Sequence, residues 1–355
     1  MTDGSTLRSV ASGDDALSVI PIRGIPEVTA GDDLAGMILA GLSANGVTLG
    51  DGDVLVVTSK VVSKALGLRR ATTDRGAVVE EETVRVVAER ATATGVTRIV
   101  EGRSGAVTAA AGVDGSNSGP SGEVLVLPVD PDAVTLDLRV TLEARVPRVR
   151  FGLILSDTAG RPWRVGQTDF ALGAAGVEVC ADHRGGMDAD GRPLEVTVRA
   201  VADELAAAGD LVKGKAERCP VALVSGAGRW VLGRGEPGPG ARRLLRVGPG
   251  DFFALGHVEA ARAALGIEPG SPAAAEVGIR SAVPETVADR IARALRAARL
   301  GEPEGTDITV TQTPTGILTI RGIDAYAVGR LAARLEVALW SEDLAGVIGV
   351  RSVLP

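Results

Sequence analysis

The sequence predicts a mixed α/β fold, and two observations support this class. Short β-branched runs such as VLVVTS recur along the chain, and segments whose apolar residues repeat at helical spacing lie between them. The chain has 355 residues, of which 45% are hydrophobic, so it can bury a sizeable core. This length fits two domains, or one large domain with an appendage.

The expected elements of the first half follow this alternation. The runs SVIPI and VLVVTS (54–59) predict strands, and between them Leu34, Met37, Ile38 and Leu42 recur at helical spacing. Helical periodicity also covers 79–94, after which TRIVEG and GAVTAAAGV predict paired strands. The pattern continues with the strand EVLVLP (123–128), a helix capped near Asp130 and the strand RVRFGLILSD (148–157).

The second half predicts a turn at DADG (188–191), the helix VTVRAVADELAAAGDLV and the strand CPVALVSG. The character of the chain then changes to an Ala-rich helix, a Pro/Gly linker (268–272), the helix PETVADRIARALRAARL, a hairpin-like pair and a last helix from 324. We therefore expect a flexible N-terminal arm (1–16), a main domain (17–256) and a small C-terminal α+β module without an assigned role (257–355).

Composition excludes several classes of function. The net charge of −7 and the aromatic content of 2% argue against a nucleic-acid-binding surface. No apolar run approaches the roughly twenty residues that span a bilayer, and the N-terminus lacks a signal-peptide pattern, so we expect a cytoplasmic protein. The two cysteines predict reduced thiols, and the two histidines match no zinc spacing, so a bound metal would be held by oxygen.

Three polar clusters each follow an apolar strand, which is where open α/β sheets place ligands. In TSKVVSK, Ser59 offers a hydroxyl, and Lys60 and Lys64 lie four residues apart, as a clamp for an anion needs. The alternative for this first cluster is a solvated lysine pair.

The second cluster, AAGVDGSNSG, carries Asp114 and Asn117 among small residues, and its alternative is an ordinary turn. The third, SDTAGRPWRVGQTD, carries Asp157 and Thr158 at a strand end. Two arginines, Arg161 and Arg164, follow them, and a surface ion pair is the alternative for the arginines.

Together the clusters offer the donors that a nucleotide and its metal need. Hard divalent cations take carboxylate and hydroxyl oxygens and keep phosphate ligands. Asp114, Asp157 and Thr158 could therefore hold such an ion, while Ser59 and Lys64 contact phosphates. Neither a Walker A motif nor a G-x-G-x-x-G after a strand is present, so a standard P-loop or Rossmann site is disfavoured.

From about Ser18 to Gly256 the sequence resembles the coenzyme F420-0:L-glutamate ligases, also called F420:gamma-glutamyl ligases. The resemblance rests on the motifs PIRGIPEVTAGDDL, GDVLVVTSKVVSK, AAGVDGSNSG, LPVDPD, SDTAGRPWRVGQTD, ADELAAAGDLVKGKAERCPVA and DFFALG, in family order. It implies a two-lobed α/β fold that forms a homodimer. It also implies GTP-dependent amide ligation through an acyl phosphate of the F420-0 lactyl carboxylate, with a second, gamma-linked glutamate as a further step.

The resemblance also implies roles for individual residues. GTP-binding positions would be Ile25, Pro26, Glu27, Val28, Ser59, Lys64 and Asn117. Metal ligands would be Asp114, Asp157 and Thr158, holding Mg²⁺ or Mn²⁺, with K⁺ as a further candidate ion. No residue is assigned as a general base, and the roles of Arg161, Arg164, Gln167 and His183 stay open.

Residues 257–355 depart from bifunctional relatives, in which an FMN-binding, nitroreductase-like domain follows the ligase. About a hundred residues are too few for that fold, and its arginine-rich start is reduced to IRS, so no flavin site is carried over. The module could be vestigial, support a dimer or bind another partner. For the whole chain, the alternatives to glutamate ligation are a non-catalytic nucleotide- or F420-binding homologue and an amide ligase acting on another carboxylate.

Overall fold

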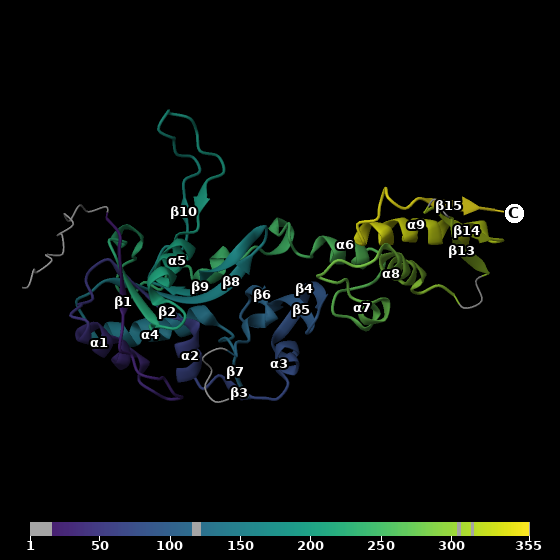
Figure 1. The fold of residues 1–355 in the computed structure, drawn as a ribbon. Coiled ribbons are helices and arrows are strands. Elements are labelled where there is room, and N and C mark those ends of the chain that lie inside the picture. The colour runs from purple at the N-terminus through teal and green to yellow at the C-terminus, as the bar shows by residue number, and fades with distance from the viewer. Residues whose placement is uncertain (1–15, 116–121, 304–306, 314–315, 355) are drawn as a thin grey trace, which may run out of the picture. The chain divides into compact units, whose positions relative to one another are not determined.

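The computed structural model describes residues 16–115, 122–303, 307–313 and 316–354 (Figure 1). The chain divides into two compact units. The first comprises Met1–Val78, Ser104–Ala106 and Val113–Leu245, and the second comprises Val79–Arg103, Val107–Gly112 and Arg246–Pro355. Both units contain strands and helices, which confirms the predicted mixed α/β class. Among the residues so described, no helix is long and apolar enough to cross a membrane.

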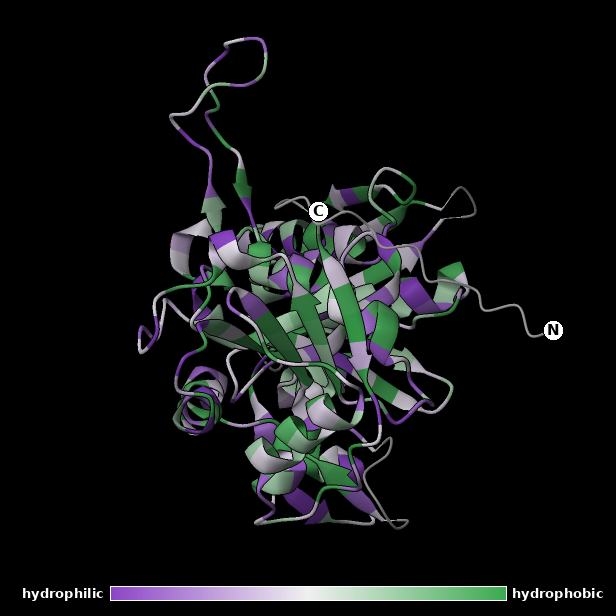
Figure 2. Cartoon of the chain, turned by 90° about the vertical axis from the view of Figure 1, so that its left-hand side faces the viewer, coloured by the Kyte–Doolittle hydropathy of each residue, from purple (hydrophilic) through white to green (hydrophobic). Residues whose placement is uncertain are grey.

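A five-stranded mixed sheet forms the centre of the first unit. Its strands lie in the order β1 (Ser18–Ile22), β12 (Val221–Ser225), β2 (Asp53–Thr58), β8 (Phe151–Arg161) and β9 (Arg164–Ala175). The pair β2 and β8 is parallel, and every other neighbouring pair is antiparallel. The strands are hydrophobic along most of their length (green in Figure 2), as expected for a sheet that is covered on both faces.

Helices cover the two faces of this sheet, and the alternation of side chains along each strand supplies both with apolar contacts. On one face, Leu55 and Leu153 pack with α1 (Leu34–Ala44), α2 (Ser59–Ala65) and α4 (Pro131–Arg145). On the other face, Val56 and Ile154 pack with α5 (Val201–Lys213). The aspartates expected to cap α1 and α4 do so, because Asp33 accepts from Gly36 N and Asp130 from Ala133 N.

Smaller elements complete the first unit. They are the antiparallel pair β3 (Arg69–Ala71) and β7 (Glu123–Leu125), the pair β10 (Ala181–Asp182) and β11 (Val198–Arg199), and the 3₁₀ turns Gly228–Trp230 and Ala241–Leu244. The β10–β11 hairpin projects from the rest of its unit (Figures 1 and 2) and carries the predicted turn at 188–191.

The second unit holds two three-stranded sheets. The sheet β4 (Thr83–Thr92), β5 (Gly95–Gly102), β6 (Val107–Ala109) is antiparallel and is followed by a 3₁₀ turn at Ala110–Gly112. In the sheet β13 (Ile308–Gln312), β14 (Leu318–Gly322), β15 (Val350–Val353), the pair β14 and β15 is parallel. The helices of this unit are α6 (His257–Ala263), α7 (Pro272–Val277), α8 (Val287–Arg299) and α9 (Ala325–Ser341), with a further 3₁₀ turn at Gly248–Gly250.

The prediction of a helix over residues 79–94 is wrong beyond Glu82. The helix α3 covers only Arg75–Glu82, and residues 83–92 form β4, which pairs with β5 along its length. Val and Thr residues dominate the start of this segment, and a β-branched run gains more from a cross-strand ladder than from a helix.

Buried ion pairs and arginine–carbonyl bonds hold the second unit together. Glu342 is fully buried and accepts from Arg262 Nη2 at 2.8 Å and from Arg293 Nη2 at 2.7 Å. Arg90 Nη1 lies 2.5 Å from Glu259 Oε1, which connects β4 to α6. Residues on both sides of the expected boundary at Gly256 therefore lie in one unit, and the division into a main domain (17–256) and a C-terminal module (257–355) stays a prediction.

A close approach between α5 and β2 yields a prediction. A Cβ added at Gly209 of α5 would lie 2.8 Å from Cγ1 of Val56. Gly209→Ala should therefore lower the free energy of unfolding by about 1 kcal/mol, because overpacking outweighs the gain of about 1 kcal/mol in helix propensity. Urea unfolding would measure the change.

A second variant separates the two effects. In a Val56→Ala background the space next to Gly209 is open, so Gly209→Ala should become neutral or stabilising there. The same loss of stability in both backgrounds would contradict tight packing as its cause.

Candidate functional site

The predicted polar clusters meet at one edge of the central sheet. Since β2 and β8 are parallel with Thr58 opposite Ser156, Ser59 at the start of α2 lies beside Asp157. The strand expected to end at Asp157 continues to Arg161, so Asp157 lies within β8 and not at its end. Ser59 Oγ donates a hydrogen bond to Asp157 Oδ1 at 3.0 Å. Two of the predicted segments are thus joined directly by their side chains.

The two predicted lysines lie on α2, and each contacts a carboxylate from another segment. Lys60 Nζ is 2.8 Å from Asp114 Oδ2, and Lys64 Nζ is 2.5 Å from Glu27 Oε1. Asp114 is fixed by backbone hydrogen bonds in both directions with Leu125. The helix therefore brings three of the sequence segments predicted to form the site to its own surface.

The segment Ile25–Val28 divides into buried and exposed positions. Ile25 and Val28 are buried in the apolar core, so their side chains cannot reach a nucleotide and only their backbone is available. Pro26 and Glu27 are exposed. The Glu27 carboxylate also lies 3.6 Å from an Arg69 nitrogen, so two cations surround it.

Asp157 occupies an electrostatically unusual position. The pKa of its carboxyl is raised to about 6, mainly by burial and to a smaller extent by the nearby carboxylates of Asp169 and Asp114, although the hydrogen bond from Ser59 opposes the shift. A divalent cation would reverse this balance, because it favours the charged form of each carboxylate. The carboxylates of Asp157 and Asp114 therefore suit a cation that binds oxygen ligands.

The strand alternation sends Thr158 to the face opposite Asp157. Its hydroxyl donates to Asp169 Oδ1 at 2.6 Å and accepts from Lys215 Nζ at 2.7 Å. The structure thus brings Asp157 into the field of Asp114 and sets the Thr158 hydroxyl apart from both. Among the described residues, no group of three or more His, Cys, Asp or Glu side chains is placed to hold a metal, so such an ion would need hydroxyl, water or phosphate oxygens as well.

A buried cluster of Asp169, Lys213 and Ser156 lies next to Thr158, and it was not predicted from the sequence. The Asp169 carboxylate accepts from Lys213 Nζ at 2.7 Å and from Ser156 Oγ at 2.8 Å, and Asp169 and Lys213 are each 4% exposed. Burial alone would raise the pKa of Asp169, but the charge of Lys213 and the three hydrogen bonds hold it below its usual value. Because the single Thr158 proton points to Asp169, the hydroxyl lone pairs are turned away from Asp169.

A β-bulge places Asp169 in this cluster. Leu155 pairs with Gly173 and Ser156 with Ala171, so Leu172 of β9 is an extra residue and the register shifts next to the site. The sequence signal was present, since Asp169 ends the motif SDTAGRPWRVGQTD and Lys213 and Lys215 lie in the motif that ends KGKAERCPVA.

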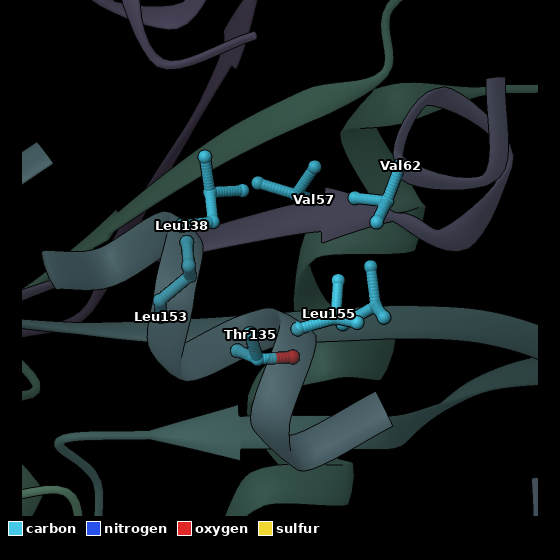
Figure 3. Close-up of a pocket in the computed structure, with 7 residues that line it drawn as sticks. Val57, Val62, Thr135, Leu138, Leu153 and Leu155 are labelled. Atoms are coloured by element: carbon cyan, nitrogen blue, oxygen red, sulfur yellow. The ribbon is translucent and has the colours of Figure 1, made fainter. Parts of the chain in front are cut away.

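The remaining predicted positions lie elsewhere. Arg161, Arg164 and Gln167 are exposed near the tip of the β8–β9 hairpin, and His183 is exposed on the β10–β11 hairpin. Asn117 lies outside the described residues. The pocket in Figure 3 is lined by aliphatic side chains, among them Val57, Leu138 and Leu155, together with Thr135. It has no space for a water molecule and belongs to the core rather than to the site.

Comparisons with known proteins point to one family. The sequence model described as F420-0:Gamma-glutamyl ligase matches residues 24–226. A coenzyme F420:L-glutamate ligase of Methanopyrus kandleri is 37% identical over 259 residues, which cover 68% of this chain and 99% of that protein. An enzyme of the same name in Methanothermobacter thermautotrophicus is 36% identical, and the match covers 67% of this chain and 98% of that protein. Another, in Halobacterium salinarum, is 37% identical over 65% of this chain and 93% of that protein.

The buried cluster gives a prediction for stability. Asp169→Asn leaves the buried charge of Lys213 without a counter-ion, and Lys213→Met leaves the buried charge of Asp169 without one. Each substitution should therefore lower the free energy of unfolding by about 3–5 kcal/mol. The double variant should be more stable than the sum of the single losses predicts, by about 1 kcal/mol or more, in a double-mutant cycle measured by urea unfolding. Strict additivity would contradict direct pairing of the two charges.

Proposed function

Because this chain belongs to the F420-0:gamma-glutamyl ligases, enzymes of coenzyme F420 biosynthesis that ligate glutamate, we propose that GTP drives its reaction. The γ-phosphoryl group of GTP passes to the lactyl carboxylate of F420-0, which forms an acyl phosphate and GDP. The amine of L-glutamate then attacks the acyl carbon, forming the amide and releasing phosphate and a proton. Gamma-linked addition of a second glutamate is part of the same proposal.

One observation carries the proposal: two lysines and a hydroxyl of α2 contact three carboxylates from separate segments, namely Glu27, Asp114 and Asp157. Lys60 and Lys64 supply positive charge for phosphate oxygens, and Ser59 supplies a hydroxyl donor. Phosphoryl transfer depends mainly on positioning and on neutralising charge, and this set of side chains suits both tasks. No side chain is needed as a covalent nucleophile, and we assign none as a general base.

A divalent ion, Mg²⁺ or Mn²⁺, would neutralise charge on the transferred phosphoryl group when bound. Asp114 and Asp157 are the carboxylates that would hold it. Thr158 stays the proposed hydroxyl ligand, although its hydroxyl faces Asp169 in this structure and not the two carboxylates. K⁺ is a further candidate for the same oxygen-rich edge. A homodimer is the proposed assembly, and light scattering of the purified protein would measure it.

The activity has a direct test. Purified protein would be incubated with F420-0, L-glutamate, Mg²⁺ or Mn²⁺ and either GTP or ATP, and the products would be analysed by mass spectrometry. We expect one glutamyl increment with GTP, and a second increment where gamma-linked addition follows. Nucleotide binding without any increment would indicate a non-catalytic homologue, and turnover only with other acceptors would indicate a ligase for another carboxylate.

The role of Asp157 has its own test. Asp157→Asn keeps the shape but removes the charge that the proposed ion needs, so turnover should fall by more than about a hundredfold with the melting temperature preserved. The matched control is Asp137→Asn, on the exposed face of α4, which should leave turnover unchanged. Near-normal turnover of Asp157→Asn would place the ion elsewhere.

A further inference from the structure

The turn that connects β8 to β9 presents a tryptophan to solvent. Arg161 pairs with Arg164, so Pro162 and Trp163 are the two central residues of the turn. The side chain of Trp163 is 81% exposed, and its neighbour Val165 is fully exposed. The chain contains eight Phe, Trp and Tyr residues, and Trp163, Phe252 and Tyr326 are the three with the most exposed side chains.

The backbone at this tryptophan is also unusual. Trp163 has φ 60°, in the left-handed region that bulky residues rarely adopt. Proline fixes φ near −65° at the preceding position, and a negative φ followed by a positive one is the pattern of a type II turn, which favours glycine at its second central position. The turn geometry therefore does not favour a tryptophan at this position, and a strained residue with an exposed side chain points to a ligand.

Two arginines accompany this ring. The side chains of Arg161 and Arg164 are exposed, and with the described part of the chain they make no hydrogen bond or ion pair. Other arginines of the same unit, such as Arg69, Arg139 and Arg145, have a carboxylate partner within the unit. The tip thus combines an aromatic face with two cations that are available to an anion.

We propose that this tip binds the acceptor substrate, with Trp163 stacked on its planar deazaflavin ring and Arg161 and Arg164 on its phosphodiester. The inference rests on the proposed function, which makes F420-0 the acceptor. That molecule is elongated: a flexible polyol chain joins the ring to a phosphodiester, and the reacting lactyl carboxylate follows at the far end.

The groups along the hairpin follow the same order. The reacting carboxylate belongs near Asp157 and Thr158, the arginines lie three residues further along the strand, and the tryptophan lies beyond them. At about 3.4 Å per residue, Thr158 and Arg161 are separated by roughly 10 Å, a span that flexible arginine side chains can shorten. Glutamate has no ring to stack, so it does not fit this tip.

The test uses the strain of the turn. Trp163→Gly removes the ring but suits the positive φ, so the melting temperature should stay equal or rise. The dissociation constant for F420-0, followed by deazaflavin fluorescence with and without a non-hydrolysable GTP analogue, should rise about tenfold or more. The KM for F420-0 should rise with it, while the KM values for GTP and glutamate stay unchanged. Trp163→Phe should recover most of the affinity.

The arginines are tested with a second probe. The double variant Arg161→Gln, Arg164→Gln should lower the affinity for F420-0 at least tenfold. Its affinity for a deazaflavin riboside, which has the ring but lacks the phosphodiester, should equal that of the wild type. Matched controls are Tyr326→Ala, which removes a ring that is 79% exposed in the other unit, and Arg192→Gln on the β10–β11 hairpin. Both should bind F420-0 normally.

The outcomes separate the two proposals. Wild-type affinity for F420-0 in Trp163→Gly, or a loss confined to GTP binding, would overturn the proposed acceptor site. Failure of the wild-type protein to bind F420-0 at all would overturn it as well. Tight, Trp163-dependent binding without glutamate addition would support the acceptor site and count against the proposed function alone.

Discussion

The site depends on the parallel pairing of β2 with β8. This single register, with Thr58 opposite Ser156, places the end of β2 beside Asp157 of β8, although these segments are about a hundred residues apart in sequence. A shift by one residue would turn Asp157 to the opposite face, because side chains alternate along a strand. The buried aliphatic side chains on both faces of the sheet fix that register, so the apolar core determines where the polar groups meet.

Much of the site could be predicted from sequence because its signals are local. Polar residues that directly follow apolar runs, such as Ser59 and Asp157, indicate where neighbouring parallel strands leave the apolar core. The strand end was predicted correctly only for Ser59, because β8 continues beyond Asp157 to Arg161. Asp169 and Lys213 could not be placed in this way. Their contact needs the bulge at Leu172 and the close approach of α5 at Gly209, and both are set by packing between segments distant in sequence.

The fold class was predictable for a similar reason, since alternating strands and helices leave a periodic pattern. The error at 83–92 shows the limit of periodicity. Val and Thr spaced along that segment satisfy a helical repeat and a strand repeat alike, and only the partner strand β5 decides between them. The buried ion pairs around Glu342 were likewise invisible, because their members come from α6, α8 and the end of α9.

The lysines of α2 are already matched with internal carboxylates, Lys60 with Asp114 and Lys64 with Glu27. A phosphate group that bound to Lys64 would therefore have to displace the Glu27 carboxylate, because this lysine already has an anionic partner. The affinity of the proposed nucleotide site would then reflect the difference in free energy between two ion pairs, which would keep it moderate. Glu27 is exposed enough to swing into water when displaced, so a bound nucleotide could leave again without stranding a buried charge.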